Sequence, residues 1–514
     1  MKQYSTVFSV LITLASGLAC SGGQLLQSQS TSGSTPAAAI TVQVAPNNAT
    51  ISSSETVQFT ASVRNTPQVA VTWATSQGTV STSGLYQAPA VNSETSVTVT
   101  ATSVKDPSKS ETATVIVTPK DSTPAPQPQN SATSKTIKEF FFGADFNGSE
   151  VWPPTDGQHR IATLSAIRLW DDGVKWGQIN TSKGVYDWAS LDSWISRAQS
   201  QHLDILYTFG DTPKWAGSIP ANKPCNSPSD YSCSAPADVN KDGTGTDANF
   251  SAFVTALVNR YKGQIAYYEL WNEADCTCYF AGTQDQMVRM GKDAAAIIRS
   301  KDPAAKILSP SAHGGTMATW FNGYIAAGGA PNFDIVDVHM RGAGSNNLKP
   351  EAFLDVYNQT MDQLQKNNLT SKTLWDGEHG NKHGQVTDTD EQAGYAAREM
   401  LLRAGVGIQR QYVYTWDKNF QGNDSGTAWD TVAGWLIGHT INPCVASGNV
   451  YTCNLDNGQV VWDTSQSCSR GSCSTSKYTY PTTYKYWTDL DGKKTSLSGK
   501  TVGIGYKPIF LTSK

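Results

Sequence analysis

Apolar and polar positions alternate with period two between residues 39 and 118, for example over residues 40–44, 57–63 and 97–101. Such alternation, with turn residues between the runs, is typical of strands that bury one face. We therefore expect a small all-β sandwich over residues 39–118. Trp73 lies in one of these runs and is expected to be a core residue rather than a ligand platform.

From residue 137 to about residue 440 the pattern changes, because strand-like apolar runs alternate with amphipathic helical segments. Eight such alternations predict an α/β fold, a closed parallel (β/α)8 TIM barrel. The expected strands are residues 140–146, 164–170, 203–210, 265–272, 306–312, 333–340, 372–378 and 410–416. The clearest expected helices are residues 189–200, 250–261, 287–300, 352–365 and 391–404.

Helical periodicity ends near residue 440, and residues 441–514 contain short β-rich runs that predict a small C-terminal β extension of the barrel. Residues 21–38 and 119–136 are instead dominated by Ser, Thr, Gly, Gln and Pro. Such segments cannot bury enough apolar surface to fold, so we expect two linkers. The Pro-containing second linker should be semi-rigid.

Residues 1–20 have the layout of a bacterial secretion signal, with an apolar run over residues 7–14 followed by small residues. In a lipoprotein signal Cys20 would become the lipidated first residue of the mature chain and tether it to a membrane. Gly17 departs from that pattern, and Gly17 with Ala19 also satisfies the rule for ordinary signal cleavage. We expect export to the bacterial cell surface, the outer membrane or the medium.

The charge of the chain argues against a nucleic-acid partner. The net charge is −4 over 514 residues, and no basic run or stripe is present. A neutral partner such as a carbohydrate suits this balance better. We expect a monomer of two or three folded units, since 15 Trp and a hydrophobic share of 39% supply a sizeable core.

Eight cysteines remain beyond Cys20, an even number that fits disulfides in an oxidising compartment. Local spacing favours the pairs Cys225–Cys233, Cys444–Cys453 and Cys468–Cys473. Cys276 and Cys278 would then form a tight ring or pair with the first couple. Zinc binding is the competing interpretation, but Cys-x-x-Cys repeats and nearby His pairs are missing from the sequence.

Two glutamates stand where the fourth and seventh barrel strands should end. Glu273 closes the run Tyr-Tyr-Glu-Leu-Trp-Asn-Glu over residues 267–273, and Glu378 closes Lys-Thr-Leu-Trp-Asp-Gly-Glu over residues 372–378. The carboxyl ends of barrel strands share one cleft. Hydrolysis of a glycosidic bond requires one group that protonates the leaving oxygen and a second carboxylate across the anomeric carbon. The pair therefore predicts glycosidic-bond cleavage.

The Trp271-Asn272-Glu273 triplet and the later Trp375-Asp376-Gly377-Glu378 run resemble the signature of clan A retaining glycoside hydrolases. The resemblance covers roughly residues 139–514. It implies a (β/α)8 barrel in which Glu273 is the acid/base and Glu378 is the nucleophile, with no cofactor. Ala274 follows Glu273 where the clan usually has proline, which affects loop rigidity more than chemistry.

Other strand ends carry residue types that the same clan uses. Arg168 ends strand two, where the clan commonly places an arginine against the nucleophile; His339 ends strand six, and Trp416 ends strand eight. The Thr-Pro-Lys-Trp segment at residues 212–215 resembles family 39 of the clan, and family 5 is the other family considered. The N-terminal sandwich, through Trp73 and its neighbours, resembles bacterial immunoglobulin-like domains and is expected to be a spacer or adhesion module.

We expect the Arg168 cation and a hydrogen bond from His339 to keep Glu378 ionised. The negative charge of Glu378, with partial burial, is expected to raise the pKa of Glu273 so that it holds a proton. Asn272 is expected to hydrogen-bond the sugar 2-hydroxyl.

Tryptophans near the strand ends are candidates for contact with the sugar. Trp416 is expected to form the apolar floor of the cleavage site. Trp170 and Trp215 are candidate walls of the cleft, although core or loop packing is the alternative for both. Several such side chains would suggest more than one sugar subsite and endo cleavage.

Asp238, Asn240 and Asp242 are spaced like the opening of a calcium loop. The closing acid is absent, because Asn249 stands at position twelve. We therefore favour an ordinary polar turn over a structural Ca2+ site.

The prediction is an exported retaining hydrolase of a β-linked glycan. A non-catalytic carbohydrate-binding barrel is the alternative from another class. An inverting hydrolase is the second rival, and a carboxyl separation near 5 Å would favour retention whereas one beyond about 6.5 Å would favour inversion.

Overall fold

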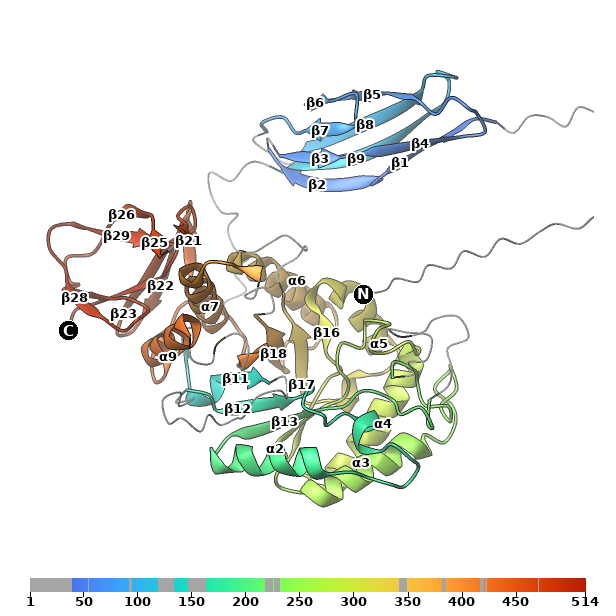
Figure 1. Cartoon of the computed structure of the whole chain (residues 1–514), viewed down its shortest axis with the longest axis vertical. Coiled ribbons are helices and arrows are strands. Elements are labelled where there is room, and N and C mark those ends of the chain that lie inside the picture. Colours follow the sequence, from blue (N-terminus) through green and yellow to red (C-terminus); the bar gives the residue numbers. More distant parts are fainter. Residues whose placement is uncertain are drawn as a thin grey trace, which may run out of the picture. The chain divides into compact units, whose positions relative to one another are not determined.

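The computed structural model describes residues 39–53, 55–91, 95–118, 134–146, 163–217, 225, 232–341, 349–380, 385–416, 420, 423–469 and 471–514. The predicted signal, the possible lipidation of Cys20 and most of the second linker lie outside these residues. The chain divides into two compact units, residues 1–121 and 122–514 (Figure 1). Over the described ranges, every helix is too short or too polar to cross a bilayer.

The N-terminal unit is all β. Its strands are β1 (Thr41–Ala45), β2 (Asn48–Ser52), β3 (Thr56–Gln58), β4 (Thr60–Arg64), β5 (Val71–Thr75), β6 (Thr79–Val80), β7 (Leu85–Gln87), β8 (Thr95–Ser103) and β9 (Ser110–Thr118). They form the sheets β1-β4, β2-β9-β8-β5 and β3-β7-β6. Because the apolar positions alternate, the inward residues of all three sheets meet in one core around Phe59, Tyr86, Val97 and Val115.

Trp73 contributes to this core, with its ring centroid 6.4 Å from that of Phe59. The predicted all-β character of this region is therefore confirmed, whereas its domain bounds at residues 39 and 118 stay a prediction. Its immunoglobulin-like assignment stays a prediction.

The second unit contains the predicted barrel. Eight parallel strands close in the order β11-β12-β13-β14-β15-β17-β18-β19 and back to β11. These strands are β11 (Phe142–Asp145), β12 (Ala166–Leu169), β13 (Asp204–Thr208), β14 (Tyr267–Glu269), β15 (Lys306–Leu308), β17 (Ile335–His339), β18 (Thr373–His379) and β19 (Arg410–Val413). Each lies inside or within one residue of a predicted run. A short strand, β16 (Ala312–His313), pairs with the end of β17.

Helices surround the barrel. They include α1 (Trp176–Ile179), α2 (Ala189–Ser200), α3 (Ala248–Tyr261), α4 (Gln284–Lys301), α5 (Asn322–Ala326), α6 (Phe353–Lys366), α7 (Thr389–Ala404) and α9 (Asp424–Leu436). All five predicted helices are present with ends within three residues of the prediction.

Helix α4 shows how the sequence sets these elements. Thr283 accepts a hydrogen bond from the backbone N–H of Gln286, whose side chain bonds back to the Thr283 N–H, so a capping box starts the helix. Met287, Met290 and Ile298 then recur at helical spacing and bury one face against the barrel.

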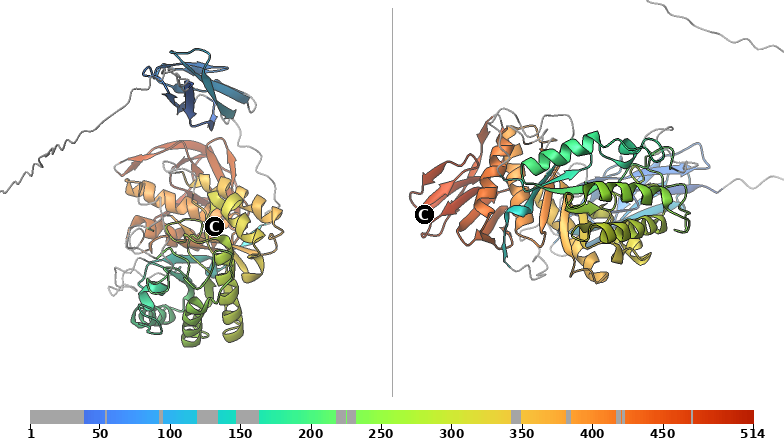
Figure 2. Two further views of the ribbon diagram at one scale, coloured as in Figure 1. Left: turned by 90° about the vertical axis from the view of Figure 1, so that its right-hand side faces the viewer. Right: turned by 90° about the horizontal axis from the view of Figure 1, so that it is seen from below.

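The C-terminal extension is also confirmed as β structure. Its strands are β20 (Thr440–Ile441), β21 (Val445–Ser447), β22 (Val450–Leu455), β23 (Gly458–Asp463), β24 (Cys468–Ser469), β25 (Ser472–Cys473), β26 (Thr475–Thr479), β27 (Tyr486–Thr488), β28 (Lys494–Ser496), β29 (Thr501–Gly505) and β30 (Ile509–Thr512). They lie beside α7 and α9 and away from α2 and α3 (Figures 1 and 2).

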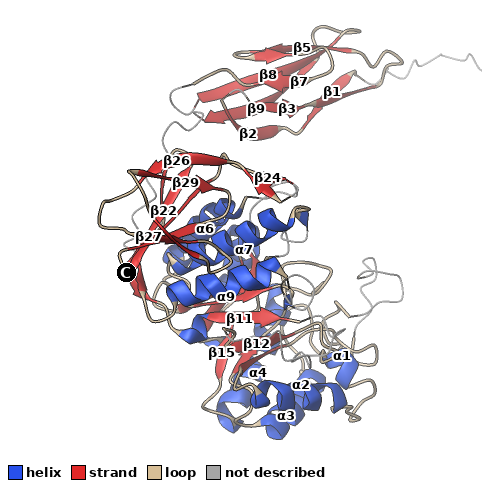
Figure 3. Cartoon of the chain, turned by 60° about the vertical axis from the view of Figure 1, so that its left-hand side comes forward, coloured by secondary structure: helices blue, strands red, loops and turns tan. Residues whose placement is uncertain are grey.

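The extension and the barrel share one core. Strands β22 and β27 of the extension lie beside α7 and α9 (Figure 3). The Trp435 ring on α9 lies 5.2 Å from that of Phe510 on β30, and Trp462 donates a hydrogen bond to Glu351 at 2.9 Å. The chain also enters this sheet before the barrel, because β10 (Lys135–Thr136) pairs with β20. Residues 135 and 136, placed in the second linker by the sequence, are therefore part of this sheet.

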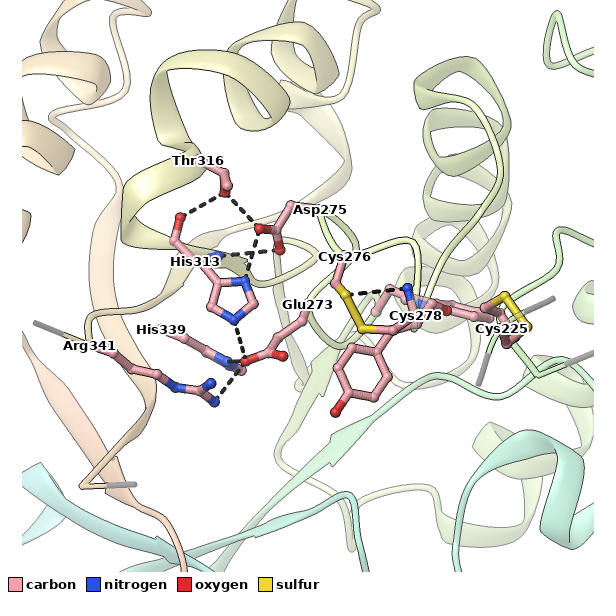
Figure 4. Close-up of a disulfide and its surroundings, with 12 residues drawn as sticks. Cys225, Glu273, Asp275, Cys276, Cys278, His313, Thr316, His339 and Arg341 are labelled. Atoms are coloured by element: carbon pink, nitrogen blue, oxygen red, sulfur yellow. Dashed lines mark hydrogen bonds and ion pairs between the residues drawn. A yellow bond between two sulfur atoms is a disulfide. The ribbon is translucent and has the colours of Figure 1, made fainter. Parts of the chain in front are cut away.

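All four disulfides form within local segments: Cys225–Cys233, Cys276–Cys278, Cys444–Cys453 and Cys468–Cys473. The three pairs predicted from spacing are confirmed. Of the two alternatives for Cys276 and Cys278, the structure has the tight ring, shown in Figure 4.

Candidate active site

The predicted carboxylates meet at the carboxyl end of the barrel. Glu378 lies in β18, and Glu273 lies in the loop that follows β14. Glu273 has a φ of 40°, a strained conformation for a residue other than glycine, and its N–H donates to the hydroxyl of Ser311 at 2.9 Å. Both glutamate residues are 4% exposed. A carboxylate oxygen of Glu273 lies within 4.8 Å of one of Glu378.

Arg168, at the end of β12, connects the buried acids. Its Nη1 donates to Glu378 Oε2 at 3.3 Å and to Asp145 at 3.0 Å, and its Nε donates to Glu269 at 2.8 Å. Its Nη2 donates to Asn272 Oδ1 at 2.6 Å. The predicted contact between Arg168 and Glu378 is therefore present, and the fully buried guanidinium balances the charge of the surrounding acids.

The predicted hydrogen bond between His339 and Glu378 is wrong. His339 Nδ1 lies 2.8 Å from Glu273 Oε1 and 3.7 Å from the nearer oxygen of Glu378. The cause is the position of Glu273: it stands in a left-handed turn four residues beyond β14, from which its carboxylate reaches the end of β17. Spacing along the sequence does not reveal this turn.

The predicted rise in the pKa of Glu273 is also wrong. Burial does raise it, but hydrogen bonds from His313 and His339 and the charge of Arg341 outweigh burial and hold the pKa of Glu273 well below its usual range. Glu273 is therefore ionised in this structure.

The structure adds residues to the site that were not predicted, among them Arg341, His313 and Asp275. The Arg341 Nη2 contacts Glu273 Oε1 at 2.7 Å and also bonds to Glu378 Oε1, so one cation bridges the two carboxylates. His313 Nε2 lies 3.2 Å from Glu273 Oε1, and Asp275 holds the other side of that ring (Figure 4). His313 directly follows the predicted fifth strand, so the rule that strand ends carry function could have found it.

Tyr279 is a fourth neighbour of the carboxylates. Burial and the charges of Glu273 and Glu378 raise the pKa of Tyr279 to about 12, so the phenol stays neutral and can donate a hydrogen bond. Its ring packs edge-on against Trp170, with centroids 5.7 Å apart.

The predicted aromatic residues are mostly enclosed. Trp416 is 4% exposed and stacks on Phe420, while Trp170 is 3% exposed. Trp215 is partly buried and donates to the carbonyl of Asn180 at 2.7 Å. Packing is therefore the observed role of all three, and their contact with sugar stays a prediction.

Two groups of three side chains in the described part of the chain lie close enough together to hold a metal ion. They are Glu269, Asp337 and His339, and Glu273, His339 and Glu378. Arg168 and Arg341 already contact the glutamates of these groups, so their positive charges compete with a cation. We assign no metal to either group.

The candidate calcium loop has internal hydrogen bonds. Asp242 Oδ1 accepts from the N–H of Thr244 at 3.0 Å, and the Asn240 side chain donates to the Thr244 hydroxyl at 2.9 Å. Asp238 Oδ2 accepts from the N–H of Asn249 at 3.0 Å. These bonds fit the favoured polar turn, and calcium binding there stays a prediction.

Asp247, next to this loop, should make the free energy of unfolding depend on pH. It is fully buried, and its carboxylate faces the acidic side chains of Asp293 and Asp238. Burial and the neighbouring Asp293 and Asp238 raise the pKa of Asp247 to about 8. Because the folded state then holds a proton that the unfolded state releases near pH 4, stability should fall as pH rises from about 4 to 8 and level off above.

We expect Asp247→Asn to remove this decline, with a gain on the order of a few kcal/mol near pH 8. Denaturant unfolding between about pH 5 and 9 would measure it. Asp242→Asn, in the exposed turn of the same loop, is the matched control and should keep the wild-type pH slope. An unchanged slope in Asp247→Asn would contradict the assignment.

Comparison with known proteins gives structural matches only. No family model and no curated protein matches the chain. A glucosidase from Croceicoccus marinus has a TM-score of 0.46 at 14% identity, over 74% of this chain and 97% of that one. A family 30 endoxylanase from Clostridium papyrosolvens has 0.48 at 14%, over 74% and 98%, and a family 30 xylanase from Clostridium acetobutylicum has 0.46 at 14%, over 74% and 97%. At such values we base no functional conclusion on them.

Proposed function

We propose that the chain is a retaining glycoside hydrolase that cleaves a β-linked glycan, with Glu378 as nucleophile and Glu273 as acid/base. The observation that carries this proposal is the separation of the two carboxylates, whose nearest oxygens lie within 4.8 Å of each other. Retaining enzymes hold their carboxyl groups about 5–5.5 Å apart, whereas inverting enzymes need about 6.5–9.5 Å to admit a water.

The reaction proceeds in two displacements. Glu378 attacks the anomeric carbon while Glu273 protonates the leaving oxygen, and the glycosidic bond breaks. Glu273 then removes a proton from water, which attacks the same carbon and releases Glu378. Configuration is retained because two inversions occur at one carbon.

The neighbouring arginines influence the ionisation of the two glutamates. Arg168 lies 3.3 Å from Glu378 and favours the ionised carboxylate that attacks. Arg341 bridges Glu273 and Glu378, where the glycosidic oxygen and anomeric carbon must lie, so the sugar has to displace it. Loss of that cation makes it easier for Glu273 to hold a proton.

The location of the enzyme is part of the proposal. The four disulfides are those of a protein that folds in an oxidising compartment, which agrees with the signal-like residues 1–20. We propose an exported enzyme of the bacterial surface or medium, with an N-terminal β unit as spacer.

Product analysis tests the function directly. The purified mature chain and its Glu378→Ala variant would be incubated with β-glucans, xylans, mannans, galactans and aryl glycosides. Products released by the wild type and not by the variant would support the proposal and identify the sugar and the cleavage mode. Binding to a glycan without turnover would support the carbohydrate-binding alternative instead.

Replacement of Glu273 by glutamine should separate acid catalysis from nucleophilic attack. We expect kcat/KM on a glycan to fall by roughly 10²–10⁴-fold, because the leaving oxygen loses its proton donor. A dinitrophenyl glycoside needs no such proton, so its first displacement should be nearly unaffected and a burst of dinitrophenol should appear. An equal loss of that burst and of glycan cleavage would contradict the acid/base role.

A further inference from the structure

Asp275, His313 and Glu273 form a continuous line of hydrogen bonds at the rim of the site (Figure 4). His313 Nδ1 lies 2.9 Å from Asp275 Oδ2, and His313 Nε2 lies 3.2 Å from Glu273 Oε1. Asp275 is itself held, because Thr316 donates to its Oδ2 at 2.8 Å and the backbone N–H of His313 donates to its Oδ1 at 3.3 Å. The imidazole is thus fixed between two carboxylates.

The two carboxylates stabilise a proton on the His313 imidazole. Burial lowers the pKa of His313, but the hydrogen bonds to Asp275 and Glu273 outweigh it and raise the pKa to about 10. His313 is therefore an imidazolium at neutral pH, beside an ionised Glu273. The other titratable or charged side chains that face this pair are those of His339, Arg341, Glu378 and Tyr279.

Glu273 needs a proton that it does not hold in the free protein. As the acid of the first displacement it must protonate the leaving oxygen, yet its carboxylate carries no proton while Arg341 bridges the site. The donor must lie within hydrogen-bond reach of Glu273 and be able to regain a proton from solvent. The side chain of His313 is 33% exposed, whereas His339 is fully buried and its Nε2 has no hydrogen-bond partner among the described residues.

We propose that His313, positioned by Asp275, is the proton reservoir of the acid/base Glu273; this inference rests on the proposed glycosidase function. When the sugar displaces Arg341, the proton on His313 Nε2 passes to Glu273 Oε1 and then to the glycosidic oxygen as its bond to the anomeric carbon breaks. His313 is left neutral, with its Nδ1–H still donated to Asp275. In the second displacement Glu273 takes a proton from water and returns it to His313 Nε2, so the cycle closes without net change.

The test compares two aryl glycosides of the sugar that the wild type cleaves. A phenyl glycoside needs a proton on its leaving oxygen, and a dinitrophenyl glycoside does not. We expect His313→Gln to lower kcat/KM on the phenyl glycoside by roughly 10–10²-fold, less than loss of the acid itself. The kcat/KM for the dinitrophenyl glycoside should stay within about twofold of the wild-type value. The alkaline limb of the pH profile of kcat/KM for the phenyl glycoside should move to lower pH.

Two further variants make the result specific. Asp275→Asn keeps the His313 imidazole but removes the negative charge beside it, which lowers the pKa of His313. The alkaline limb of this variant's phenyl-glycoside profile should therefore also move to lower pH, by less than in His313→Gln. His439→Gln is the matched control, because His439 Nδ1 lies 2.8 Å from Asp456 on the remote C-terminal extension. It should keep both activities and the wild-type pH profile. Thermal unfolding of each variant would verify the fold.

The possible outcomes separate failure of the proton-reservoir role of His313 from failure of the proposed glycosidase function. Equal loss on both glycosides in a folded His313→Gln, or no loss on either, would overturn the reservoir while leaving the glycosidase intact. Absence of wild-type turnover on every glycoside and glycan would overturn the proposed function itself.

Discussion

Replacement of Glu378 by glutamine should lower kcat by roughly 10⁴-fold or more on every substrate, including activated aryl glycosides. The amide has nearly the shape of the carboxylate but cannot attack the anomeric carbon, so no glycosyl-enzyme forms. We propose this role for Glu378 because its carboxylate contacts Arg168 and Arg341 and lies within 4.8 Å of Glu273. Steady-state kinetics on the substrate that product analysis identifies would measure the loss.

The comparison between Glu378→Gln and Glu273→Gln makes the assignment specific. Loss of the nucleophile removes the dinitrophenol burst, whereas loss of the acid preserves it. Glu139→Gln, an exposed carboxylate just before the first barrel strand, is the matched control and should behave like the wild type. A Glu378→Gln variant that retained a burst would assign the nucleophile to another residue.

Replacement of Arg168 by methionine should have the largest effect on stability. It leaves Asp145, Glu269 and Glu378 buried beside one another without their shared cation. Removal of one partner from a buried ion pair typically costs about 3–5 kcal/mol, because the remaining charge is uncompensated. Activity should fall as well, since Asn272 loses the guanidinium that holds its side-chain oxygen at 2.6 Å.

Denaturant unfolding would measure this loss. Arg260→Met is the matched control: Arg260 pairs with Asp192 at 2.6 Å, but both side chains are more than 40% exposed. That exposed pair should contribute at most about 1 kcal/mol. If Arg168→Met were no less stable than Arg260→Met, the charge balance proposed for the site would be wrong.

The barrel was predictable because each of its signals is local. Strand-like runs and helical periodicity alternate eight times, and the helices α4, α7 and α9 each begin at a side-chain cap. Parallel strands then bring their carboxyl ends together, so Glu273, Glu378, Arg168 and His339 could be assigned to one cleft.

The hydrogen bonds and ion pairs among those residues were not predictable, because they depend on backbone turns and on neighbours from other strands. The left-handed turn at Glu273 directs its carboxylate to His339. His313 and Arg341, which hold Glu273 ionised, come from two other strand ends, and their charges reverse the pKa shift expected from burial alone. Only the three-dimensional structure shows that the side chains in contact with the Glu273 carboxylate are mainly cationic.

The anomeric configuration of the first product tests the central claim most directly. Proton NMR during cleavage of the identified β-linked substrate would record which anomer appears before mutarotation. Two displacements through Glu378 predict that the β anomer appears first. Initial formation of the α anomer would show inversion and contradict the assignment of Glu378 as a nucleophile.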